Sequence, residues 1–255
     1  METDARVVGT PEHCDQVQAE AEGYAPSAPP VTCIPAVSRG SAPGAEVNEL
    51  SVLRPGVCVT ALKHLHSAAE PPDPDHDPNP VLVLPDLGPA LMHPPGPAAV
   101  GQVGRTLANP GDEGGSLLYQ FRVGRFALTW HDTVGPLKER APHVLRRLRE
   151  LPPTDVQAGA ILGLNLAPNG LRDPALYVEA LRPKVFAPLH HDFLTEYGSA
   201  DDYQAAFRRE PQVRNVAPEI RWLSDPHDYL RPGLLDFDLT DPHWSAGEPA
   251  AAPCP

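Results

Sequence analysis

The sequence predicts an α/β fold, in which a β-sheet is covered by helices. From Pro142 onward, amphipathic helical segments alternate with short apolar segments, and this alternation indicates strands joined by helices. Before this part, residues 117–136 contain two strand-like segments separated by a glycine, which predicts a hairpin. The chain has 255 residues, of which 41% are hydrophobic, enough for one domain with a substantial core.

The predicted hairpin joins strands at Leu117–Arg122 and Phe126–Trp130, and Gly124 permits the tight reversal between them. The second strand ends abruptly on a His-Asp-Thr triplet that contains Asp132. A carboxylate at the end of a buried strand is costly to desolvate unless it accepts hydrogen bonds or binds a cation. Asp132 is therefore a candidate ligand, although Asp-Thr-Val-Gly-Pro is also typical turn chemistry.

The N-terminal part begins inside the same α/β pattern. Residues 5–10 predict a short strand, and Thr10 and Pro11 then supply an N-cap and a proline at the first helical position. Further strands are predicted at Val31–Ile34, Leu50–Leu53 and Val57–Leu62.

A long proline-rich segment lies between Ala69 and Gly115. It predicts a single strand, at Val81–Leu84, so we expect a long excursion over the surface of the domain. Both a flap over a site and a partly ordered insertion fit this composition.

The C-terminal half supplies the remaining elements. A helix that begins at Pro142 places Val144, Leu148 and Leu151 on one buried face, opposite a face of solvated arginines. The Pro/Ala-rich sequence at 241–255 predicts a disordered tail, so we expect the domain to span residues 1–240. The other elements predicted here are a strand at Val156–Leu162, a helix at Pro174–Leu181, a strand at Lys184–Pro188, a helix at Ser199–Arg209 and a strand at Ile220–Leu223.

The charge balance limits the partners. Twenty basic residues against 33 acidic ones give a formal net charge of −13, which repels phosphate backbones and anionic membranes, so we expect neither as a partner. No apolar run is long enough to span a membrane and no signal peptide is evident, so a cytoplasmic location is expected. The four cysteines, Cys14, Cys33, Cys58 and Cys254, form no C-x-x-C pair; we expect them to be reduced, with a disulfide as the alternative.

Candidate chemistry lies at the ends of predicted strands. His66, Asp132 and His190 each follow a strand at the point where it gives way to a loop. Such ends can converge on one edge of an α/β sheet, and two imidazoles with a carboxylate are typical zinc ligands. The alternative is a set of surface or hydrogen-bonded core residues, since the chain has eleven histidines.

Three motifs in order strengthen the metal-site hypothesis. They are Val-Thr-Ala-Leu-Lys-His-Leu-His-Ser with His66, Phe-Ala-Leu-Thr-Trp-His-Asp-Thr-Val-Gly-Pro with Asp132, and Leu-Arg-Pro-Lys-Val-Phe-Ala-Pro-Leu-His-His-Asp with His190. Together they resemble the metallo-β-lactamase-fold hydrolases, in particular the lactonase-like and phosphodiesterase-like branch, over residues 5–239. The resemblance implies an αββα sandwich with a dinuclear zinc site on its edge. In it, His66 completes the first metal site, Asp132 bridges both metals and His190 belongs to the second site.

The sequence departs from this family in one major respect. The family supplies most of its ligands from a His-x-His-x-Asp-His motif, and no such motif occurs here. His64-Leu-His66 matches its first half, but Ser67-Ala-Ala-Glu70 follows where Asp-His would be required. Residues 5–14 align just downstream of the missing motif, so we expect an N-terminally incomplete sandwich. A second departure is His131, in place of the usual glycine, whose imidazole would crowd the metal or add a ligand. His64, His76 and His191 are the next candidate ligands.

The resemblance implies metal-dependent hydrolysis of a small-molecule ester, lactone or phosphodiester, with Asp132 as the catalytic residue that fixes the two metals. Because only three of the usual ligands are present, we expect at most one zinc ion. Two other hypotheses stay open: a non-catalytic fragment or pseudoenzyme of this fold, and an unrelated α/β binding module in which the three residues are structural. The segment 163–170 is either a loop near the site or plain turn chemistry.

Overall fold

The structure, a computed structural model, describes residues 6–27, 29–54, 56–76, 115–191, 200–223, 226–231 and 233–244, together with residues 92, 94, 96 and 97. The strand predicted at Val81–Leu84 and the tail beyond residue 244 lie outside these residues. None of the helices that the structure describes combines the length and the hydropathy needed to cross a bilayer.

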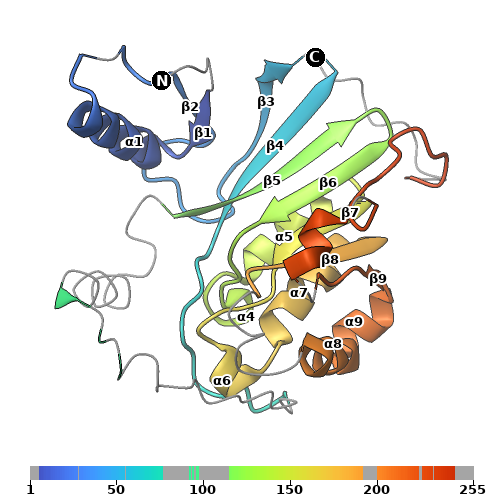
Figure 1. The fold of residues 1–255 in the computed structure, drawn as a ribbon. Coiled ribbons are helices and arrows are strands. Elements are labelled where there is room, and N and C mark those ends of the chain that lie inside the picture. Colours follow the sequence, from blue (N-terminus) through green and yellow to red (C-terminus); the bar gives the residue numbers. More distant parts are fainter. Residues whose placement is uncertain are drawn as a thin grey trace.

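The main element is a mixed seven-stranded sheet, which confirms the α/β class (Figure 1). Its strands lie side by side in the order in which they occur in the chain. The three ladders from β3 to β6 are antiparallel, and the three from β6 to β9 are parallel. The strands are β3 (Val47–Arg54), β4 (Val57–His64), β5 (Ser116–Val123), β6 (Phe126–His131), β7 (Val156–Ala160), β8 (Val185–Leu189) and β9 (Glu219–Ile220).

A small unit precedes this sheet. It consists of β1 (Val7–Gly9), α1 (Pro11–Tyr24) and β2 (Cys33–Pro35), and its two strands pair in parallel in a sheet of their own. The predicted helix start is confirmed, because the backbone N–H of His13 donates to the Thr10 hydroxyl at 3.2 Å.

The expectation of reduced cysteines is wrong for this unit, in which Cys14 and Cys33 form a disulfide. The parallel β1–β2 ladder is the physical reason. It sets the start of α1 beside β2 and leaves the two Cα atoms 5.6 Å apart, within the range that a disulfide spans. The residues that the structure describes include no free cysteine.

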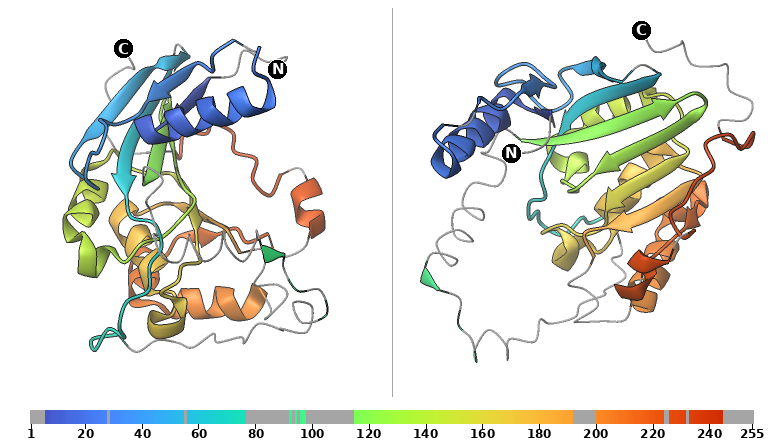
Figure 2. Two further views of the ribbon diagram at one scale, coloured as in Figure 1. Left: turned by 90° about the vertical axis from the view of Figure 1, so that its left-hand side faces the viewer. Right: turned by 45° about the horizontal axis from the view of Figure 1, so that its top comes forward.

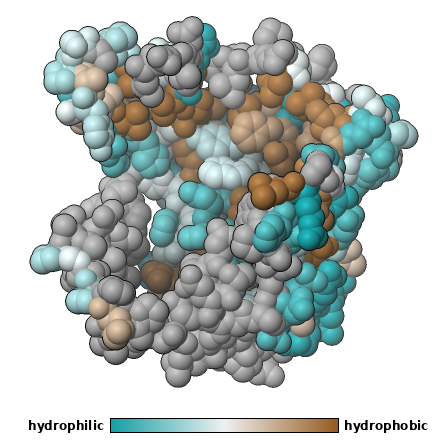
Figure 3. Space-filling view, in the orientation of Figure 1, coloured by the Kyte–Doolittle hydropathy of each residue, from teal (hydrophilic) through white to brown (hydrophobic). Residues whose placement is uncertain are grey.

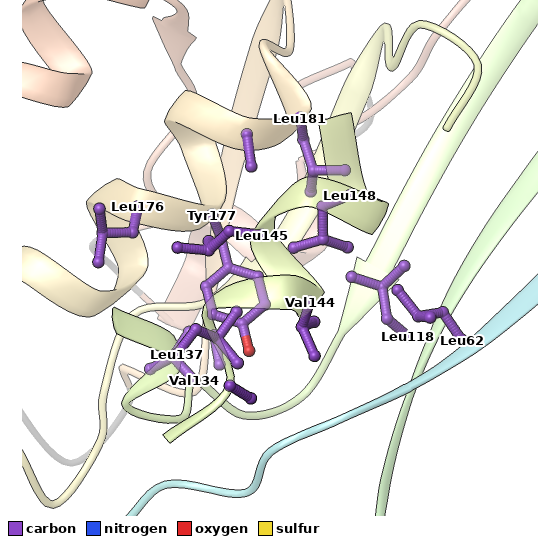
Figure 4. Packing of buried hydrophobic residues seen from close by; sticks show 13 residues of the cluster. Leu62, Leu118, Val134, Leu137, Val144, Leu145, Leu148, Leu176, Tyr177 and Leu181 are labelled. Atoms are coloured by element: carbon purple, nitrogen blue, oxygen red, sulfur yellow. The ribbon is translucent and has the colours of Figure 1, made fainter. Parts of the chain in front are cut away.

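Helices cover one face of the seven-stranded sheet, whereas the unit formed by β1, α1 and β2 lies on the opposite side (Figures 1 and 2). The main core lies between the sheet and helices α5 and α7, where Leu62 and Leu118 of the sheet meet Val144, Tyr177 and Leu181 (Figure 4). The helices are α4 (Leu137–Arg140), α5 (Pro142–Glu150), α6 (Leu166–Asn169), α7 (Arg172–Leu181), α8 (Ala200–Arg209) and α9 (Pro211–Val216), with a 3-10 turn at Pro226–Leu230.

The opposite face of the sheet is apolar and only partly covered. Along β5 and β6, the partly exposed Tyr119, Phe121 and Trp130 alternate with buried residues that face the helices. Figure 3 shows apolar side chains gathered over this part of the sheet. Toward β8, the same face is covered by Trp244, which is buried against Phe126. Ordered packing therefore extends beyond residue 240, where we expected the domain to end.

Candidate functional site

The topology brings the ends of four strands to one edge of the sheet. Strands β4, β6, β7 and β8 all run in the same direction, because two antiparallel ladders separate β4 from β6 and the next two ladders are parallel. His66, Asp132 and His190 follow the C-terminal ends of β4, β6 and β8, and all three are exposed. The structure thus places the three predicted site residues at the same edge, which we call the polar edge.

The loops that carry His66 and Asp132 are in direct contact, although β5 lies between their strands. The backbone N–H of Ser67 donates to the hydroxyl of Thr133 at 3.0 Å, and both residues are buried. Gly135 permits this approach, because a Cβ atom there would lie 2.4 Å from the Leu65 Cβ and 2.8 Å from the His66 carbonyl oxygen. Each of the two site residues is thus one position away from a fixed contact between the loops.

The ring of His66 is oriented by its own loop. Its Nδ1 atom lies 3.1 Å from the Ser67 carbonyl oxygen, which can only accept a hydrogen bond. Nδ1 is therefore the donor, and Nε2 is the ring nitrogen left for another partner. A histidine that binds a metal is usually oriented in this way, by a carbonyl that accepts from its other ring nitrogen.

His190 stands further along the polar edge. Strand β7 lies between β6 and β8, so the backbones of the outer two strands are about 10 Å apart. His190 has a left-handed backbone, with φ of 58°, immediately after β8. Among the residues that the structure describes, no three His, Cys, Asp or Glu side chains are arranged to hold a metal ion together.

A buried polar layer lies beneath the polar edge, on the side of the sheet that faces the helices. The hydroxyl of Tyr177 lies 2.8 Å from Nδ1 of His64, and the Tyr177 ring stacks on His131 with 4.7 Å between ring centroids. His131 in turn contacts the Thr133 carbonyl oxygen through Nδ1 at 3.0 Å and the Gln157 amide nitrogen through Nε2 at 2.9 Å.

This layer corrects the expectation for His131. Both of its ring nitrogens have partners within the protein and its side chain is fully buried, so it neither crowds nor supplements a metal at the polar edge. Burial lowers the pKa of His131 to about 4 and lowers that of His64 well below its usual range, so both imidazoles are neutral.

Two of the alternative ligands are also buried. His64 belongs to the layer just described, and His191 packs against the Trp222 ring with 5.0 Å between ring centroids. Neither side chain reaches the polar edge as an exposed group.

A second polar cluster attaches residues 69–76 to α6 and α7. The sequence analysis did not predict it. The Arg172 guanidinium is buried and lies 2.6 Å from Asp73, 2.7 Å from Glu139 and 2.8 Å from Asp173. Hydrogen bonds from Lys138 and Arg172 hold the pKa of Asp73 well below its usual range. We call these residues the Arg172 cluster.

Two asparagines complete this attachment. Asn165 accepts from the backbone N–H of Glu70 at 3.1 Å, and Asn169 accepts from that of Asp73 at 2.6 Å. The segment 163–170 is thus more than a turn, because its buried amides bind the chain that follows the loop of His66. Two asparagines in one short segment are the feature of the sequence that could have indicated this attachment. No feature of the proline-rich segment indicates that Asp73 is buried.

A further pair, of a partly buried histidine and a fully buried glutamate, lies at the end of this segment. Nε2 of His76 is 3.6 Å from Oε2 of Glu210, and neither Glu210 oxygen has a hydrogen-bond partner among the described residues. Burial raises the pKa of Glu210 to about 7 and lowers that of His76. His76 is therefore part of a structural pair rather than a ligand at the polar edge.

Comparison with known proteins finds similarity among solved structures alone. No family model and no curated protein matches the sequence. Among solved structures, the chain is similar to Igni18, a novel metallo hydrolase from the hyperthermophilic archaeon Ignicoccus hospitalis KIN4/I, with a TM-score of 0.47 and 12% sequence identity. The match covers 87% of this chain, which spans 66% of the length of Igni18. Likeness at this level does not transfer an activity, so the residues of the polar edge decide what can be proposed.

Proposed function

We propose that this chain is a metal-dependent hydrolase with a variant of the metallo-β-lactamase sandwich, acting on a small-molecule ester, lactone or phosphodiester at the polar edge. The observation that carries the proposal is the contact between Ser67 and Thr133, which holds the loops of His66 and Asp132 together at the exposed ends of β4 and β6. An exposed imidazole, oriented through Nδ1, and an exposed carboxylate are thereby presented on adjoining loops.

The side chains present fit one zinc ion better than two. His66 and Asp132 are of the right type, are exposed and lie on loops in contact, whereas the described residues contain no group of three ligands. Bound there, a zinc ion would supply a hydroxide near neutral pH and would polarise a carbonyl or phosphoryl oxygen of the substrate. We expect His66 and Asp132 to hold it and His190 to contact the substrate or the ion from the far side of β7.

The first test measures zinc binding and turnover in the same preparations. Isothermal titration with zinc should give at most one equivalent, bound weakly, and hydrolysis of nitrophenyl esters and bis-nitrophenyl phosphate should depend on added zinc. His66→Ala and Asp132→Ala should each reduce zinc affinity about tenfold or more, because each removes one of few protein ligands.

The matched controls are His143→Ala and Asp201→Ala. Both residues are exposed, His143 on α5 and Asp201 on α8, and neither belongs to the loops that carry His66 and Asp132. Their variants should bind zinc and turn over substrate like the parent. Tight binding of two zinc ions would contradict the ligand assignment. Equal losses in controls and site variants, or no zinc-dependent turnover at all, would favour a non-catalytic member of the fold.

A further inference from the structure

His131 makes two hydrogen bonds whose directions can be assigned. The Thr133 carbonyl oxygen can only accept, so Nδ1 of His131 is the donor across their 3.0 Å separation. Nε2 lies 2.9 Å from the Gln157 amide nitrogen, which can only donate, so Nε2 is the acceptor of the second bond. The ring therefore connects β7, through Gln157, to the turn that follows β6.

That turn contains Asp132. The hydrogen bond from His131 to the carbonyl of Thr133 closes the turn from one side, and the hydrogen bond from the Ser67 N–H to the Thr133 hydroxyl closes it from the other. Asp132 lies between the two residues that are fixed, and its own side chain is exposed. The backbone that carries the Asp132 carboxylate is thus fixed by hydrogen bonds on both sides, at His131 and at Thr133.

The space around His131 is shaped for this ring. Tyr177 stacks on one face of it, and a Cβ atom at Gly159 would lie 2.4 Å from Nε2. An apolar side chain of similar size would fill this space. It would leave the Thr133 carbonyl and the Gln157 amide without partners, and a buried polar group without a partner is costly.

We propose that His131 is the positioning residue of the polar edge, acting through Thr133 to fix the turn that presents Asp132 beside His66. The effect of His131 on zinc affinity rests on the proposed function, whereas its effect on the conformation of the turn does not. The two effects can therefore be measured separately.

The test compares His131→Asn with His131→Leu. The asparagine amide nitrogen can occupy the place of Nδ1 and donate to the Thr133 carbonyl, whereas leucine fills the space without donating. Hydrogen exchange at the Ser67 amide, the donor to Thr133, reports on the turn without any metal. We expect exchange at Ser67 to rise about tenfold or more in the leucine variant and to stay near the parent value in the asparagine variant.

Zinc affinity provides the second measurement. It should fall about tenfold or more in His131→Leu and recover in His131→Asn, as expected when a group that orients a ligand is lost and restored. If His131→Leu does not fold, His131→Ala replaces it, because an alanine side chain also cannot donate to the Thr133 carbonyl.

The outcomes separate the two proposals. Fast exchange in the leucine variant with rescue by asparagine supports the role of His131, even if no preparation binds zinc and the proposed function fails. Equal exchange in both variants, or zinc affinity that falls while exchange at Ser67 is unchanged, overturns that role.

Discussion

Among single residues, Glu210 gives the clearest dependence of stability on pH. Burial raises its pKa from 4.5 to about 7, and Nε2 of His76 lies 3.6 Å from its carboxyl group. Between these two values the folded protein keeps a proton on Glu210 that the unfolded chain has lost. The contribution of Glu210 is therefore fully present below pH 4.5 and is lost as the pH rises through 7.

Glu210→Gln should remove this dependence, because its amide stays neutral at every pH. Relative to the parent, the variant should gain about 2 kcal/mol of unfolding free energy between pH 5 and pH 8. Urea denaturation at both pH values measures the change. Glu20→Gln, at an exposed position of α1, is the matched control. A difference between parent and Glu210→Gln that is the same at both pH values would contradict the prediction.

The candidate residues at strand ends could be predicted because one physical rule governs them. A polar residue directly after an apolar strand has to face solvent or a partner, so His66, Asp132 and His190 could be identified as candidates at the sheet edge. Their common location is now described, whereas their role as ligands remains a prediction. The sequence could not predict the orientation of His131, which depends on Gln157 and Tyr177 from elements that follow it by many residues.

At the scale of elements, the Arg172 cluster determines how firmly residues 69–76 are attached to α7. Arg172→Met would remove the cation that lies between the buried Asp73 and Asp173. Breaking a buried ion pair on one side leaves an uncompensated charge, which costs about 3–5 kcal/mol. We expect a loss of this size in urea denaturation, together with faster proteolysis within residues 69–76.

Arg147→Met is the matched control for this change. Arg147 pairs with Glu150 at 3.0 Å on the exposed side of α5, where such a pair contributes less than about 1 kcal/mol. If both variants lost the same small amount of stability, the buried cluster would not hold the segment in the way described.

The elements themselves were largely predictable, because each is specified by local patterns. The helix from Pro142 and the hairpin of β5 and β6 are confirmed almost to the residue. Two elements differ from the prediction. Helix α7 starts at Arg172 rather than at Pro174, because Arg172 is held by acidic residues from distant segments that a local pattern does not contain. Helix α9, which begins with Pro211, was missed.

At the scale of the whole molecule, the N-terminal unit is stabilised internally by its disulfide and is joined to the sheet by hydrogen bonds. The Tyr119 hydroxyl donates to the Val8 carbonyl at 3.0 Å, and Asn48 donates to the Ala36 carbonyl at 2.9 Å. Replacing Cys14 and Cys33 by serine should lower the stability of this unit by about 3 kcal/mol, the loop entropy expected for 19 residues of separation.

Hydrogen exchange resolved by segment is the measurement for this pair of substitutions. Exchange should rise in α1 and β2, while β7 and β8, which lie far along the sheet order, should keep the parent rates. An equal increase throughout the sheet would show instead that the unit and the sheet unfold together.

The order of the strands in the sheet also has a consequence for how the chain reaches its fold. Every ladder joins strands that are neighbours in sequence, so β3 with β4 and β5 with β6 can each form as a local hairpin within microseconds. The β4–β5 ladder differs from the others in the length of chain between its two strands, which comprises residues 65–115. Closing that loop costs conformational entropy before any contact compensates for it. We therefore expect the two hairpins to form first and independently, and their docking along β4 and β5 to limit the rate of folding.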